Sequence, residues 1–180
     1  QQVRRVIQYA SAEGHTRIGA LVPASGFGEL VVASARLASE QSGGTVVQAT
    51  YYDPGDSELS PLIRQFADYD FRKSALVEQK SLLSGKSDQI SKQALNRLSG
   101  LETLGDPPFD SVLLPAGDPE LRGIAPLLAY YDVDPARIRF LGTALWDEAR
   151  GLGTEPALVG GWYAAPAPES RLIFEDKFER

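Results

Sequence analysis

The chain has 180 residues, enough for one domain that buries roughly 70% of its unfolded surface. A domain of this size does not need disulfides or metal ions to hold its core together. Hydrophobic residues make up 43% and charged residues 23%, which excludes a disordered chain, and no apolar run approaches the ~20 residues of a membrane-spanning helix. The formal net charge of −6, with both signs interleaved, argues against a nucleic-acid partner, and the absence of cysteine excludes disulfides and thiolate chemistry.

Helix and strand patterns alternate through the first third of the chain. Apolar residues at helical spacing predict a helix that ends at Gly14, and residues 17–23 then predict a buried strand. A tight turn at residues 25–28 leads into a helix over about residues 29–41. Residues 45–50 predict the next strand, and Ser60 is expected to cap the helix after it.

The alternation returns in the last part of the chain. Strands are predicted at residues 109–115, 138–142 and 159–164, with a helix over about residues 120–131. A last helix begins near Pro168 and its pattern is unfinished at Arg180, so we expect this chain to be cut from a longer protein, with any targeting signal removed before Gln1. Together these elements predict a doubly wound, mainly parallel α/β sheet with helices on both faces.

Residues 60–105 are too long for an ordinary crossover between two strands. The segment is helical almost throughout, about twenty residues longer than a crossover needs. We therefore expect a single α/β lobe over residues 1–180 with a helical arm at about 60–105 inserted in it. The arm is locally basic, so it either docks an acidic partner or forms a solvated hairpin. A modest apolar seam is predicted along it from Leu76, Leu83, Ile90, Leu98 and Leu101.

Loops at the carboxyl ends of parallel strands are the places where open sheets of this class bind ligands. These loops hold glycine, serine, aspartate and aromatic residues, which suit recognition but also suit turns. Trp146 follows a strand end and either lines a cleft or joins the core, whereas Trp162 is expected in the core. The residues that we expect to face a ligand are Ser25, Phe27, Gly28, Gly117, Asp118 and Trp146.

No set of residues has the spacing of a catalytic or metal site. Gly26-Phe27-Gly28 resembles the start of a dinucleotide turn, but Val31 stands where the third glycine would be. His15 is the only histidine and is expected to be a solvated turn residue. We expect no enzyme activity, no cofactor and no metal, and an oxidoreductase with a degenerate glycine turn is the weakest alternative.

The order of elements resembles that of the second lobe of type I periplasmic binding proteins of the leucine-binding kind. Within that family, the chain is most similar to the penicillin-binding protein activators. The resemblance covers nearly the whole chain and rests on four phrases: RIGALVPASGFGE, FDSVLLPAGDPELRGIAPLLAYYDVDP, RFLGTALWDE and GGWYAAPAPESRLIFEDKF. Amino-acid-binding members carry Asp and Tyr-Gly in the first turn. This chain has Phe27-Gly28 there, without the tyrosine hydroxyl.

The resemblance implies a non-catalytic lobe that regulates peptidoglycan synthesis by protein–protein contact with a synthase, a penicillin-binding protein. It also implies a periplasmic location, a lipoprotein anchor on the outer membrane through a missing segment, and a first lobe elsewhere in the same protein. The alternative is the ligand-binding lobe of a substrate-binding protein for an amino-acid-type ABC transporter, with a small amino-acid-like ligand. We expect neither a nucleic-acid partner nor a transmembrane segment.

Overall fold

The structure, a computed structural model, describes residues 1–148 and 155–165. Its centre is a five-stranded sheet in the order β2-β1-β3-β4-β5, and every neighbouring pair is parallel. The strands are β1 (Arg17–Pro23), β2 (Thr45–Tyr52), β3 (Ser111–Leu113), β4 (Arg139–Gly142) and β5 (Trp162–Tyr163).

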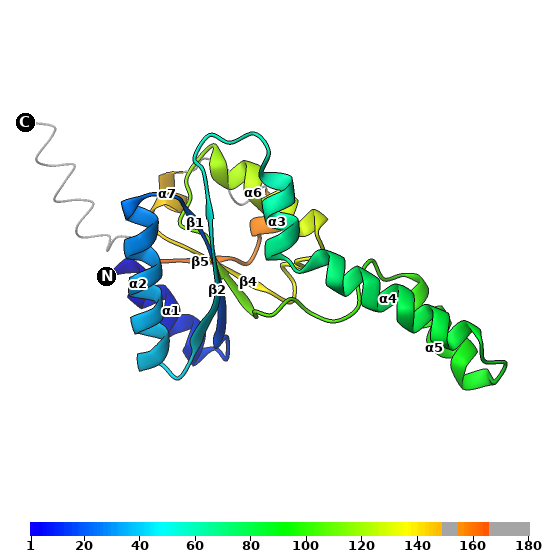
Figure 1. The fold of residues 1–180 in the computed structure, drawn as a ribbon. Helices are drawn as coiled ribbons and strands as arrows, with labels where there is room; N and C mark the ends of the chain where they lie inside the picture. The colour runs from blue at the N-terminus through cyan, green and yellow to red at the C-terminus, as the bar shows by residue number, and fades with distance from the viewer. Residues whose placement is uncertain (149–154, 166–180) are drawn as a thin grey trace, which may run out of the picture.

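Helices cover both faces of the sheet, with α1 and α2 on one side and α3 and α6 on the other (Figure 1). This confirms the predicted class, a mixed α/β fold on a parallel sheet. The helices are α1 (Gln2–Ala12), α2 (Gly26–Gln41), α3 (Leu59–Phe66), α4 (Tyr69–Ser84), α5 (Gln89–Ser99), α6 (Glu120–Tyr130) and α7 (Leu145–Glu148), with a 3₁₀ turn η2 (Pro156–Leu158).

Each face of the sheet has its own apolar core. On the α1 and α2 side, Ile18 and Val22 of β1 pack with the buried face of α1. On the α3 and α6 side, the rings of Phe66 and Phe109 stack with their centroids 4.7 Å apart. Alternate residues of β1 therefore serve opposite cores, as the two-residue period of a strand requires.

Two strands are shorter than their apolar runs predict. Phe109 lies before β3 and is fully buried, but the carboxylate of Asp110 accepts hydrogen bonds from the backbone N–H of Arg17, at 3.1 Å, and of Thr16. The Asp110 side chain thus replaces part of the backbone hydrogen-bond ladder before β3. The 3₁₀ turn η2 ends at Leu158, directly before the predicted run, and Gly160 within that run has a positive φ of 82°, so β5 starts only at Trp162.

Helix starts also differ from the predictions. α2 begins at Gly26, three residues before the predicted position, because Ser25 rather than a later residue supplies the cap. The prediction that Ser60 caps the next helix is wrong: Glu58 is the cap position of α3, and the Ser60 hydroxyl lies 2.5 Å from the hydroxyl of Tyr131. The predicted last helix lies outside the described residues.

The expected arm contains α3 and a hairpin of α4 and α5 that projects from the lobe (Figure 1). Leu76 of the predicted seam is buried, but Ile90 is 80% exposed and Leu101 is 46% exposed, so the places of these two residues in that seam are wrong. The insertion of this arm within a single domain stays a prediction. Among residues 1–148 and 155–165, no helix has both the length and the apolar character needed to cross a bilayer.

Candidate functional site at the carboxyl edge of the sheet

The carboxyl ends of the parallel strands meet at one edge of the sheet. The strand order reverses between β1 and β3, which is where open sheets of this kind place a ligand crevice. The loop after β4 lies beside these two at the same edge, since β3 pairs with β4. The geometry of these three loops therefore decides what the edge can bind.

The turn after β1 is tight because only two residues separate the end of β1 from the start of α2. The Ser25 hydroxyl caps α2 by accepting a hydrogen bond from the N–H of Gly28 at 3.3 Å. A side chain on Gly28 would place its Cβ 2.0 Å from the carbonyl oxygen of Pro23. Gly28 is thus required for packing, and Phe27, 47% exposed, is the large apolar side chain that the turn presents to solvent.

A hollow of ≈ 600 Å³ lies beside Phe27, and we call it the carboxyl-edge hollow. It brings together the first turn of α2, the loop after β4 and the start of α1. No Asp, Glu, Lys or Arg side chain of the described residues lines it, so it suits a mainly apolar ligand. The lining residues are Gln1, Gln2, Val3, Phe27, Val31, Thr143, Ala144 and Leu145.

Two polar groups of the loop after β4 belong to this hollow. The N–H of Ala144 donates to the side-chain oxygen of Gln2 at 3.0 Å, which ties the start of α1 to the loop. Thr143 is 4% exposed, and its hydroxyl has no hydrogen-bond partner among the described residues. An unpaired buried hydroxyl costs free energy, so Thr143, with Gln1 and Gln2, supplies the polar groups of a hollow without charged side chains.

Residues after β3 lie near this hollow but do not line it. Gly117 is adjacent to Leu145, since a Cβ on Gly117 would stand 3.8 Å from the Leu145 carbonyl oxygen. The carboxylate of Asp118 accepts a hydrogen bond from the Nε of Arg122 at 2.9 Å, one turn along the helix. Of the expected site residues, the structure therefore brings only Phe27 into the hollow, with Ser25 supporting its turn.

The expectation that Trp146 faces the cleft is wrong. Trp146 is 3% exposed, and its indole N–H donates to the carbonyl of Leu114 at 2.9 Å. The ring covers Gly142, where an added Cβ would stand 2.2 Å from it. A buried partner for the indole N–H, together with a glycine beneath the ring, makes this tryptophan a core residue.

Sequence reasoning missed Thr143 and Leu145. Thr143 lies in the loop after β4 and Leu145 is the first residue of α7, directly after that loop. The strand pattern places this segment at the ligand edge, so its position was predictable. Which of its side chains turns outward depends on α7, a helix of four residues that follows directly. The tryptophan was the conspicuous residue, but the small polar and apolar neighbours line the hollow.

Tyr52 at the end of β2 is the buried titratable group nearest to this edge. Burial, with a smaller effect of the Glu120 charge, raises the pKa of Tyr52 to about 12. The phenol is therefore neutral at physiological pH. A neutral phenol that belongs to the core on the α3 and α6 side serves packing and not acid–base chemistry.

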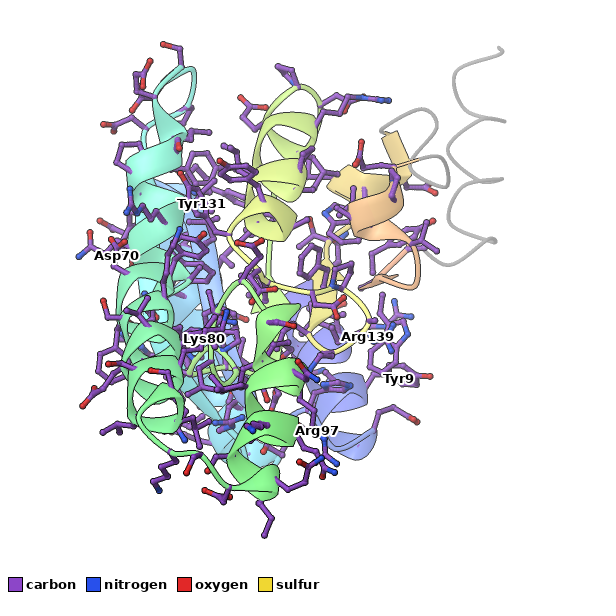
Figure 2. All side chains as sticks on the ribbon, turned by 90° about the vertical axis from the view of Figure 1, so that its right-hand side faces the viewer. Tyr9, Asp70, Lys80, Arg97, Tyr131 and Arg139 are labelled. Carbon is purple, nitrogen blue, oxygen red and sulfur yellow. The ribbon has the colours of Figure 1, made fainter. Side chains whose placement is uncertain are left out.

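A second hollow, of ≈ 540 Å³, lies between α1 and β5 at the side of the sheet. The rings of Tyr9 and Trp162 meet edge to face there, 4.9 Å apart, and the Arg139 guanidinium stands 4.7 Å from the centre of the Trp162 ring. Figure 2 labels Tyr9 and Arg139 beside each other. His15 also packs against Trp162, at 5.5 Å, so it is half-buried and not the solvated residue that we expected.

Known proteins share this architecture. A family model described as periplasmic binding protein matches residues 1–71. The solved structure of a solute-binding protein of an ABC transporter from Rhodopseudomonas palustris HaA2, in complex with p-hydroxybenzoic acid, is similar over 100% of this chain and 41% of its own, with 16% identity and a TM-score of 0.54. The chain has the fold of a periplasmic binding protein lobe.

A second solute-binding protein of this fold, from Rhodopseudomonas palustris BisB5 in complex with 3,4-dihydroxybenzoic acid, has 10% identity and a TM-score of 0.52. The similarity covers 79% of this chain and 29% of that one, so the lobe spans well under half the length of either solved protein. No curated protein matches the sequence. Nothing in these comparisons supports the activator type of the fold.

Proposed function

We propose that this chain is the ligand-binding lobe of a solute-binding protein and that its ligand is a small, mainly apolar or aromatic molecule. The observation that carries the proposal is the half-exposed ring of Phe27 beside a hollow without charged side chains, at the edge where open sheets bind ligands. Hollows of this size fall within the range of small-molecule sites, which are usually apolar with a few polar groups.

A carboxylic acid with an aromatic ring fits this arrangement best. The ring can lie against Phe27, Val31 and Leu145, and the positive end of the α2 dipole at its first turn favours an anionic group. The two solute-binding proteins that share the fold were solved with hydroxybenzoic acids, which makes p-hydroxybenzoic acid the first probe. The expected amino-acid ligand is the alternative, with leucine as its probe.

Thermal unfolding with the ligand tests the proposal. At about ten times its Kd, p-hydroxybenzoic acid should stabilise the chain by about 1.4 kcal/mol, which raises Tm by a few degrees. Phe27→Ala should abolish this increase. The matched control is Leu30→Ala, three residues along the same helix and 72% exposed, which should retain it. The proposal fails if Phe27→Ala keeps the full increase or if the wild-type chain shows none with any of these probes.

Binding without catalysis and a periplasmic location are part of this proposal. The solved proteins that share the fold are described as solute-binding proteins, and the matching family model as periplasmic binding protein. Anchoring as a lipoprotein stays a prediction.

Regulation of peptidoglycan synthesis is the second candidate function. The observation that favours it is the projecting hairpin of α4 and α5, which a lobe that only encloses a small ligand does not require (Figure 1). The similar proteins support the transporter candidate instead. Ligand stabilisation that depends on Phe27 favours the first candidate, whereas binding of a peptidoglycan synthase through the hairpin favours the second.

A further inference from the structure

The hairpin of α4 and α5 is fixed at its base and contributes little to the core beyond it. At the base, the N–H of Leu104 donates to the carbonyl of Arg72 at 3.0 Å, and Leu76 is buried. From residue 77 to residue 99, Ser91 alone is buried. The outer part of the hairpin therefore contributes almost nothing to the core, and nearly all of its surface is accessible to a partner.

A groove of ≈ 670 Å³ runs between the two helices of this outer part. Its polar side chains are one ammonium, three hydroxyls and one amide. The hydroxyls of Ser84 and Ser99 donate to backbone carbonyls of their own helices, which leaves the ammonium, the Ser81 hydroxyl and the amide as donors for a partner. No carboxylate lines it. The lining residues are Lys80, Ser81, Ser84, Leu95, Asn96 and Ser99, and we call this the arm groove.

The charges around the arm groove favour an anionic partner. α4, α5 and the turn between them carry six basic and three acidic side chains, although the whole chain has a net charge of −6. One of the six, Arg72, is buried at the base and paired with Asp132, so five basic side chains remain. Two of the three acidic groups are engaged: Asp70 pairs with Arg64, and Asp88 caps α5. Lys92, one turn before Asn96 on the same helix face, extends the positive charge towards the tip. Figure 2 labels Lys80 and Arg97, one on each helix.

The rest of the lobe decides where such a partner can bind. Since the chain outside the hairpin is strongly acidic, it repels an acidic segment and leaves the arm groove as the attractive surface. Leu95 in the groove and Val77 beside it, 63% exposed, add apolar contact. A segment of protein with acidic and apolar side chains matches both features.

We propose that the arm groove binds an acidic segment of a partner protein. The contact is weak and transient, because exposed charge pairs contribute little individually and salt screens them. It does not depend on the ligand site at the carboxyl edge, which lies on the sheet and shares no residue with the hairpin.

Fluorescence anisotropy with a labelled peptide of alternating Glu and Leu residues tests this proposal on the full chain. Lys80→Glu in the groove should weaken binding by about tenfold, because an attraction becomes a repulsion. The matched control is Lys86→Glu, which makes the same charge change in the turn between the helices and should change the Kd by less than about twofold. Raising the salt should weaken the wild-type complex.

Three results would overturn the proposal: no binding of the peptide by the wild-type chain, equal weakening by the two variants, or tighter binding to phosphatidylglycerol vesicles than to the peptide. Equal weakening would show that net charge alone is responsible, and preference for vesicles would show that a membrane is the occupant. Circular dichroism checks that each variant keeps its helix content.

Discussion

Arg72 is the residue that joins the arm to the lobe. Its side chain is 3% exposed, and its guanidinium donates to the carbonyl of Gly105 at 3.1 Å and to the carboxylate of Asp132 at 3.3 Å. The hydroxyl of Thr103 bonds the same carboxylate. Burial lowers the pKa of Arg72 from its ordinary value and the Asp132 charge opposes this, but the guanidinium remains charged.

Replacing Arg72 by alanine should strongly destabilise the chain. The change removes the only charged partner that the described residues give the Asp132 carboxylate, which keeps the Thr103 hydroxyl, and it removes the Arg72 hydrogen bonds to the carbonyl of Gly105. The expected loss is about 3 kcal/mol, at the low end for buried pairs because Asp132 is 38% exposed. Arg97→Ala, on the exposed side of α5, is the control and should cost less than about 0.5 kcal/mol. Urea unfolding measures both, and equal losses would refute this role of Arg72.

Single residues were predictable from the sequence where backbone position decides their role. Phe27 follows β1 at a glycine turn, so its exposure at the ligand edge follows from the strand pattern. Trp146 and Thr143 were not predictable in this way. The orientation of Trp146 depends on Gly142 and on the carbonyl of Leu114, which lie in other strands or loops of the sheet.

The sequence predicted which helices and strands form better than it predicted where they begin and end. The five strands appear at the predicted places along the chain, because each apolar run is bounded by glycine, proline or aspartate. Their lengths were not predictable, since β3 starts only after the Asp110 side chain has replaced ladder hydrogen bonds, and β5 starts only after a turn. In the arm, helical spacing placed Ile90 inside, but Ile90 lies at the start of α5, which turns it to solvent.

The start of α5 should depend on pH through Asp88. The N–H of Ser91 at 2.9 Å and its hydroxyl at 2.7 Å donate to the carboxylate, which lowers the pKa of Asp88. A lowered pKa means that the cap stabilises the helix above the unfolded pKa of about 4 and that this contribution is lost as the pH falls through the folded value.

Carbon-13 chemical shifts of α5 measure that dependence. Helix content in the first turn of α5 should be constant from about pH 7 to 5 and fall below about pH 4. Asp88→Asn keeps a good cap without a titrating group, so its shifts should stay flat over the same range. An unchanged decline in the asparagine variant would show that another group controls the helix.

At the scale of the whole molecule, the sequence pattern alone predicted a parallel sheet between two helical layers, and the structure confirms it. The function was less predictable, because one fold serves transport and regulation alike. Within the described residues, the phrases that carry the resemblance to this fold family lie mainly in the strands, in α6 and in the turns beside them, which the fold requires whatever the protein binds. The carboxyl-edge hollow depends on residues distant in sequence, such as Gln2 and Ala144.

A site that lies between two lobes should bind weakly when one lobe is alone. Enclosed ligands have roughly 70–90% of their surface buried, and a single open hollow covers much less, so most of the affinity is lost. We therefore expect this chain to bind p-hydroxybenzoic acid or leucine with a Kd of about 1 mM or weaker.

Backbone amide shifts in an NMR titration with these two probes test the central claim most directly, because they report where the ligand lies and how tightly it binds. The account predicts shifts that change at Phe27, Thr143 and Leu145 around the carboxyl-edge hollow, in the millimolar range. Shift changes confined to the second hollow, around Tyr9 and Trp162, would contradict it. Micromolar binding of leucine to this chain alone would contradict it as well.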